Sequence, residues 1–87
     1  MTSFPSMSFI LQEAGSALQD DYDVVMACVE RSGIALSFAS KRLQDDTNIV
    51  HAAVAETPLA LTYASKRLRQ DKTTILLAMA VLARAYI

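Results

Sequence analysis

One stretch of this chain occurs twice, and that repetition limits what the chain can fold into. Residues 35–43 read Ala-Leu-Ser-Phe-Ala-Ser-Lys-Arg-Leu, and residues 60–68 read Ala-Leu-Thr-Tyr-Ala-Ser-Lys-Arg-Leu, so the two copies align without a gap. Between 33–45 and 58–70, 7 of 13 aligned positions are identical, whereas chance would give roughly one. An internal repeat of this length predicts an array of similar supersecondary units.

The match extends in both directions from the repeated stretch. Asp21 and Asp46 occupy the same position, and Asp71 opens a third copy. Toward the N-terminus, residues 17–20 match residues 42–45 at three of four positions. We therefore interpret the chain as a single helical-repeat domain, 1–87, with four parts: a degenerate half unit (1–20), two whole units (21–45 and 46–70), and a half unit with an apolar C-terminal helix (71–87).

Apolar residues recur at helical spacing within each unit. In the unit 21–45, the first helix is expected over 22–32, with Val25, Cys28 and Val29 on its apolar stripe. The second helix of this unit is expected over 34–43. Helices of about ten residues are marginal alone and must stack on their neighbours. The hydrophobic fraction of 53%, with only two Gly and two Pro, also favours ordered helix. We expect an all-α fold of about six short helices in tandem helical hairpins, arranged as a small solenoid or curved bundle.

These residues resemble a known family. The pattern Asp-x-x-Val-Val-x-Ala-x-Val, then Gly-x-Ala-Leu-x-Phe-Ala-Ser-x-x-Leu, is similar to the repeat of the family called domain of unknown function 4116. The resemblance covers about residues 14–80 and departs at Pro58, in the glycine position, and at both ends. It implies short tandem helices and no established activity. The matching residues in the first unit are Asp21, Val24, Val25, Ala27, Val29, Gly33, Ala35, Leu36, Phe38, Ala39, Ser40, Leu43 and Asp45.

Aspartates recur where one helix is expected to give way to the next. They are Asp20, Asp21, Asp45, Asp46 and Asp71. A carboxylate metal site is one interpretation, but repetition at one structural position favours capping of the helix that follows and compensation of its dipole. We expect no metal and no cofactor.

Two residues are the only candidates for a nucleophile and a base. Cys28 aligns with Ala53 and Ala78, which predicts an inert thiol at a helix contact. His51 aligns with apolar residues and is expected at the margin of the buried face. The sequence contains no glycine-rich phosphate loop and no metal-ligand spacing. We therefore expect no catalytic residues and no enzyme.

The helix after Asp71 departs from the repeat. The position that breaks the earlier copies, Gly33 and then Pro58, becomes Ala83, so this helix is expected to run on to about 85 or 86. Its outward positions have also become apolar, and a helix apolar all round must be buried on two sides. One interpretation is that it folds back over the helix expected near the start of the chain, from about Phe9 to Leu18, and closes a bundle. The favoured interpretation is an interface with a second copy or a larger assembly.

We therefore predict a protein-interaction or structural module whose contacts come from the C-terminal helix and from the exposed flanks of Met7, Phe9 and Ile10. The partner is expected to be a second copy or another protein of unknown identity. The predicted interface residues are Leu76, Leu77, Val81, Leu82, Tyr86 and Ile87.

Basic residues gather at the ends of the second helices and suggest an alternative. They could contact phosphate or an anionic membrane surface, although they also suit helix C-termini, where Arg42 and Arg67 would lie on Phe38 and Tyr63. The possible anion contacts are Lys41, Arg42, Lys66, Arg67 and Arg69.

The charge balance bears on partners and location. A net charge of −1 gives no reason to expect nucleic-acid binding. The longest apolar run, 75–83, is too short for a membrane span, and residues 1–8 do not resemble a secretory signal. One cysteine suits a reducing compartment, so an intracellular, cytoplasmic location is the default expectation.

Overall fold

The computed structural model describes residues 16–85, and all regular structure in this range is helical. The predicted all-α class is confirmed. The predicted contact residues Met7, Phe9 and Ile10 precede Ser16 and lie outside the described range. In chain order the elements are α2 (Ser16–Gln19), α3 (Tyr22–Arg31), the 3-10 helix η1 (Gly33–Phe38), α4 (Lys41–Gln44), α5 (Thr47–Glu56), the 3-10 helix η2 (Pro58–Tyr63), α6 (Lys66–Arg69) and α7 (Lys72–Ala85).

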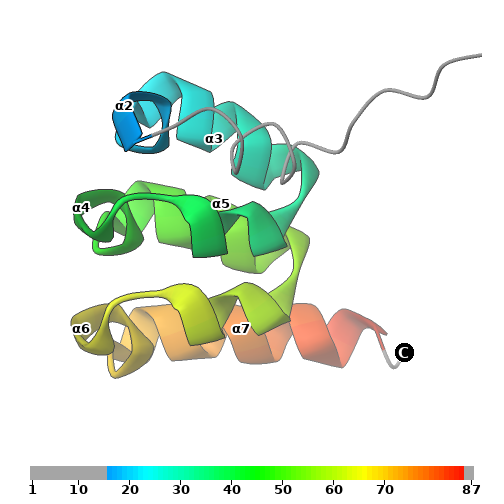
Figure 1. Ribbon diagram of the computed structural model, residues 1–87. Helices are drawn as coiled ribbons and strands as arrows, with labels where there is room; N and C mark the ends of the chain where they lie inside the picture. Colours follow the sequence, from blue (N-terminus) through cyan, green and yellow to red (C-terminus); the bar gives the residue numbers. More distant parts are fainter. Residues whose placement is uncertain (1–15, 86–87) are drawn as a thin grey trace, which may run out of the picture.

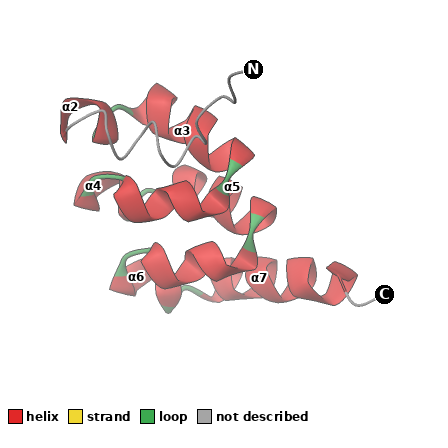
Figure 2. Ribbon diagram, turned by 45° about the vertical axis from the view of Figure 1, so that its right-hand side comes forward, coloured by secondary structure: helices red, strands yellow, loops and turns green. Residues whose placement is uncertain are grey.

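The helices are arranged in successive layers. α3 packs on α5 and α5 packs on α7, while η1 and η2 pack against these helices and against each other. Figure 1 shows α2, α4 and α6 one above another at one side of the molecule. Figure 2 shows α7 at the opposite end of the stack from α2, so α7 does not close a bundle over α2. The fully buried large apolar side chains between the layers are Val25, Val29, Leu36, Leu43, Ile49, Val50, Val54 and Leu68.

Each long helix begins at an aspartate, as the sequence predicted. A carboxylate oxygen of the aspartate accepts a hydrogen bond from the backbone N–H three residues later, which satisfies one of the unpaired donors of the first turn. The three caps are Asp21 to Val24 at 3.1 Å, Asp46 to Ile49 at 3.0 Å, and Asp71 to Thr74 at 3.0 Å.

The second helix expected over 34–43 is interrupted, and that expectation was wrong. Ala39 and Ser40 have extended backbone, with ψ of 158° and 159°, and they separate η1 from α4. The Ser40 N–H donates to the Gln19 carbonyl of the preceding layer at 2.9 Å instead of to a helical carbonyl. The Ser40 hydroxyl then caps α4 by accepting from the Leu43 N–H at 3.3 Å. Serine competes for backbone groups in this way, which is why it favours helix starts over helix interiors.

The same interruption occurs at Ala64 and Ser65, between η2 and α6. For this reason residues 16–85 contain eight helical elements, where about six were expected for the whole chain.

Gly33 is required by close packing between layers. A Cβ atom there would collide with the backbone carbonyl oxygen of Ala53 on α5. The Gly33 N–H also donates to the Glu56 carboxylate at 2.5 Å. At the corresponding positions one layer on, Pro58 has no N–H and Val81 stands in place of Glu56. The donor and the acceptor are therefore lost together, which accounts for the departure of Pro58 from the glycine position.

α7 continues past the position where α3 and α5 end. α3 is followed by Ser32 and α5 by Thr57, both with extended backbone, and each is followed by a 3-10 helix. Leu82 and Ala83 take these positions in α7, which runs to Ala85. The predicted extension of the C-terminal helix is confirmed.

The replacement Gly33→Ala tests the close approach of the layers. We expect it to lower the free energy of unfolding by about 1–3 kcal/mol, because the Ala53 carbonyl cannot move without displacing α5. The measurement is urea unfolding followed by circular dichroism. Pro58→Ala is the matched control and should change stability by about 1 kcal/mol or less. Equal losses in the two variants would contradict the assigned role of Gly33.

Candidate functional site

A polar cluster joins the first two layers on the side where α2 and α4 lie. Asp20 accepts hydrogen bonds from the Ser40 hydroxyl at 2.6 Å and from Arg42 Nε at 2.9 Å. A second guanidinium nitrogen of Arg42 donates to the Asp20 backbone carbonyl at 2.7 Å. With the Ser40 N–H to Gln19 bond, four contacts hold the start of α4 against the end of α2. We call this set of contacts the Asp-Ser-Arg clamp.

A second clamp of the same geometry joins α4 to α6. Asp45 accepts from the Ser65 hydroxyl at 2.6 Å and from Arg67 Nε at 2.9 Å, and Arg67 also donates to the Asp45 carbonyl at 2.7 Å. We expected both arginines to lie on the neighbouring aromatic rings, but their guanidinium groups bind the aspartate of the preceding layer. We also expected Asp20 and Asp45 to cap helices, whereas they bind these arginines.

The clamps lower the pKa of both aspartates. The pKa of Asp20 lies below its ordinary value of 3.8, first because Ser40 donates a hydrogen bond to the carboxylate and then because Arg42 does. Ser65 and Arg67 lower the pKa of Asp45 in the same order. Both ion pairs are largely exposed, so solvent screens their charges and the geometry of the hydrogen bonds matters more than the attraction.

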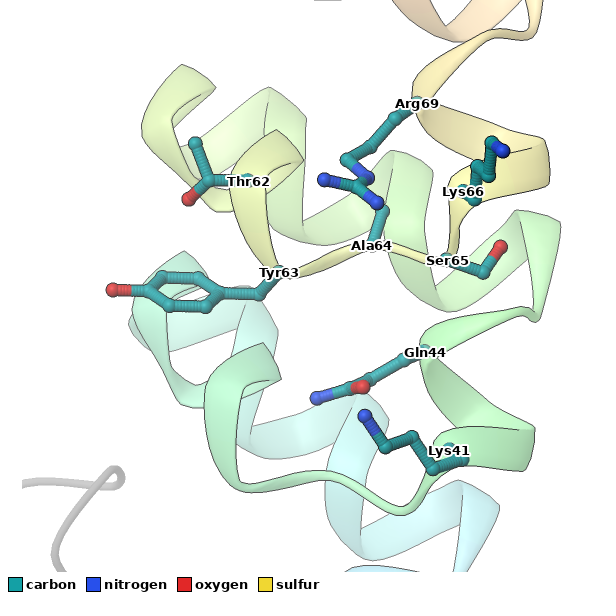
Figure 3. A pocket seen from close by; sticks show the side chains of 8 residues that line it. All are labelled: Lys41, Gln44, Thr62, Tyr63, Ala64, Ser65, Lys66 and Arg69. Atoms are coloured by element: carbon teal, nitrogen blue, oxygen red, sulfur yellow. The ribbon is translucent and has the colours of Figure 1, made fainter.

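A hollow of about 500 Å³ lies between α4, α6 and the end of η2. Figure 3 shows the Lys41 amino group and the Arg69 guanidinium turned toward it. Lys66 also lines it, with the neutral side chains of Gln44, Thr62, Tyr63, Ala64 and Ser65. Within residues 16–85, no carboxylate lies within ion-pair distance of these three cations. We call this hollow the basic pocket.

The structure divides the five predicted anion contacts into two groups. Arg42 and Arg67 are held in the clamps and are not at the basic pocket. Lys41, Lys66 and Arg69 come together there. The repeat alone could not separate them, because Lys41 and Arg42 are adjacent and recur as a pair.

An apolar groove of about 400 Å³ lies between η2 and α7, at the end of the stack. Its walls are aliphatic except for Thr62 and Arg69. Leu59 on η2 and Met79 on α7 are 69% and 59% exposed, the most exposed large apolar side chains in the described range. The lining residues are Pro58, Leu59, Leu61, Thr62, Arg69, Ile75, Ala78, Met79 and Leu82. We call this the end groove.

The predicted interface residues are distributed over α7 in several environments. Leu82 lines the end groove, and Leu76 is also exposed, on another part of the helix. Leu77 and Val81 are partly buried, with Leu77 packed on the core. Tyr86 and Ile87 lie outside the described residues.

The η2 wall of the groove was not identified from the sequence. Leu59 aligns with Ile34, which is also exposed. Two apolar residues at the same exposed position of the repeat are the sequence signal that could have indicated this wall of the groove.

Comparison with known proteins supports the resemblance found in the sequence. A family model described as Domain of unknown function (DUF4116) matches residues 3–44. The match covers 42 of the 87 residues, so this segment is similar to the DUF4116 family. No curated protein matches the chain, and no solved structure matches it. The similarity to DUF4116 brings no activity with it, so function must be inferred from the surfaces of the molecule.

The remaining reactive side chains lie in buried or hydrogen-bonded positions. Cys28 is buried, and burial raises the pKa of its thiol, so the unreactive protonated form is favoured at neutral pH. His51 Nε2 lies 3.0 Å from the buried Thr74 hydroxyl, which also donates to Asp71. The hydrogen bonds from the Thr74 backbone and hydroxyl are the main cause of the lowered pKa of Asp71.

Two features are absent from residues 16–85. Residues 16–85 contain no cluster of three or more His, Cys, Asp or Glu side chains that could hold a metal ion. No helix in that range has the length and apolar character needed to cross a bilayer.

The clamps predict a dependence of stability on acid pH. Because the folded state lowers the pKa of Asp20 and Asp45, their stabilisation is complete above the unfolded value of 3.8 and is lost as the pH falls through the folded values. We expect the urea midpoint to fall as the pH is lowered below about 4. In the double variant Asp20→Asn, Asp45→Asn the fall should be smaller, because the two clamp carboxylates are gone. A part of the fall should remain, because the pKa of Asp71 is also lowered in the folded state. Parallel pH profiles for the two proteins would contradict this role.

Proposed function

We propose that this chain is a non-catalytic protein-interaction module, built as a solenoid-like stack of repeat units whose open end binds protein. The recurrence of the clamp distances from one unit to the next supports the stacked units. The positions of Cys28 and His51 support a non-catalytic role, because both serve packing and hydrogen bonding between helices.

One observation carries the proposal, and it is the end groove. An apolar channel with Leu59 and Met79 largely exposed on its walls is costly in water, since about 25 cal/mol is lost for each Å² of apolar surface left uncovered. A free end of a helical stack normally has a polar outer face. This end is apolar, so the groove has the composition of a surface that a partner covers.

Site-specific photo-crosslinking in cells tests this proposal. A photoreactive phenylalanine analogue is placed at position 79 in the groove or, as control, at position 55, an exposed alanine on the middle helix α5. We expect covalent protein adducts from position 79 at several times the yield from position 55. Equal yields at the two positions would contradict an interaction surface at the groove.

The basic pocket favours a second candidate function, the binding of a phosphate group. Three cations without acidic partners among the described residues surround one hollow, and the Lys41 and Arg69 head groups both face it. Phosphate oxygens accept hydrogen bonds from such groups, and arginine can bind two oxygens at once. The phosphate could belong to a small molecule or to the surface of an anionic membrane.

Titration with inorganic phosphate, followed by NMR, tests the pocket. We expect backbone shifts confined to α4, α6 and the end of η2 at low salt, and weaker binding at high salt because the charges are screened. The triple variant Lys41→Gln, Lys66→Gln, Arg69→Gln should lose the response, whereas Lys72→Gln, which removes a cation outside the pocket, should keep it. Anionic vesicles in a flotation assay test the membrane source. A response that survives the triple variant would contradict this function.

A further inference from the structure

The end groove has a counterpart inside the molecule, and that counterpart is filled. The floor of the end groove is Ile75, Ala78 and Met79. The residues at the same positions of the preceding unit, Val50, Ala53 and Val54, are all fully buried, because η2 folds back over α5 and η1. Met79 is 59% exposed where Val54 is 0% exposed. The groove is therefore the seat of a 3-10 segment that α7 does not provide.

The missing segment follows from the continuation of α7. After α3 and α5 the chain turns back as η1 and η2, and each 3-10 helix covers the groove beside its own long helix. α7 passes through that turn position as helix. The occupant that fits the open groove is thus a short segment of the same kind as η1 and η2, with small or aliphatic residues facing inward.

This chain contains one further segment in that register. Residues 8–13, Ser-Phe-Ile-Leu-Gln-Glu, align with η1 and η2 when the sequence is shifted by whole units, and Leu11 matches Leu36 and Leu61. The segment precedes the described residues, so its assignment comes from the sequence register alone. Its Ile10 aligns with Ala35 and Ala60, which are both fully buried.

The segment cannot reach the groove of its own chain. Only residues 14 and 15 separate it from Ser16, and each residue spans at most about 3.6 Å. The layer of α5 lies between α3 and α7, and packed helices are about 8–10 Å apart. If residues 8–13 occupy the groove, they therefore come from a second copy.

The helix surfaces at the two ends also suit each other. Between α5 and α7 the facing pair is His51 and Thr74. Across a junction between two copies the facing positions would be Leu76, one unit after His51, and Val24, two units before Thr74. Leu76 is 54% exposed, so the pair would be apolar.

The clamp charges are absent from both ends. Gln70 stands where Asp20 and Asp45 stand in the clamps, and Ala17 stands where Arg42 stands. A junction would therefore leave no clamp charge without its clamp partner, which matters because an unpaired buried charge is costly.

We propose that copies of this chain associate head to tail, with residues 8–13 of one copy seated in the end groove of the next. The trailing helix α7 of one copy and the leading half unit of the other then complete one whole unit. This inference rests on the proposed interaction function and names the partner. Such a contact joins two different surfaces and does not close on itself, so it generates open oligomers rather than a symmetric dimer.

Sedimentation velocity over a range of protein concentrations is the first test. We expect the wild-type chain to form concentration-dependent oligomers. Met79→Glu should weaken the association at least about tenfold, because the junction would bury a carboxylate without a partner. Ala80→Glu is the matched control and should change nothing, since position 80 corresponds to the exposed Glu30 and Ala55. Circular dichroism confirms that both variants are folded.

A mixing experiment decides whether the contact is head to tail. Met79→Glu blocks one end and Ile10→Glu blocks the other, so each variant alone should be a monomer of 9.5 kDa. An equimolar mixture retains one intact junction and should form a 1:1 dimer that does not grow further. A mixture that stays monomeric, or an Ile10→Glu variant that still dimerises alone, would overturn the head-to-tail contact.

Failure of this inference is distinguishable from failure of the proposed function. A wild-type chain that is monomeric at all concentrations overturns self-association. Strong photo-adducts with a different protein at position 79 would, in that case, leave the interaction function standing. Absence of both self-association and adducts would contradict the head-to-tail contact and the interaction function together.

Discussion

Polar contacts at a fixed spacing determine how the apolar layers of this molecule are oriented on one another. Helices of four to ten residues, such as α4 and α5, have little stability of their own, so each needs a neighbour. The Asp-Ser-Arg clamp supplies a directional contact between layers, where apolar packing alone would leave the orientation loose. Its serine serves twice, as donor to the aspartate of the preceding layer and as cap of the following helix. The interruption between η1 and α4 thus frees the Ser40 backbone and hydroxyl to bond to the preceding layer.

The end of the stack differs from its interior through coupled changes. Gly33 and Glu56 form a hydrogen bond between layers, and Pro58 and Val81 replace both partners at the next position. Neither change leaves an unsatisfied group, because the donor and the acceptor disappear together. Ala83 removes the turn in the same region, and α7 lengthens. The apolar end groove results from these changes acting together.

Much of this architecture could be predicted from the sequence. The helical class, the aspartate caps and the extension past Ala83 follow from the spacing of apolar residues and from the chemistry of residues close together in the sequence. The break at Ser40 could not be predicted, because it depends on a bond to Gln19 in another layer. The partners of Arg42 and Arg67 were missed for the same reason, since their aspartates lie 22 residues away. The basic pocket and the end groove could not be predicted either, since each is formed by residues from successive layers whose packing the sequence does not show directly.

The fixed spacing of the clamps has a consequence for how such a chain can change in length. Asp20 precedes Ser40 by 20 residues, and Asp45 precedes Ser65 by the same number. A single inserted residue within α3 would rotate the buried stripe by about 100° and shift one half of the clamp away from the other. A whole added unit would instead keep every contact in register. Under the proposed repeat organisation, length variants of this architecture should therefore differ by whole copies of a unit such as 21–45.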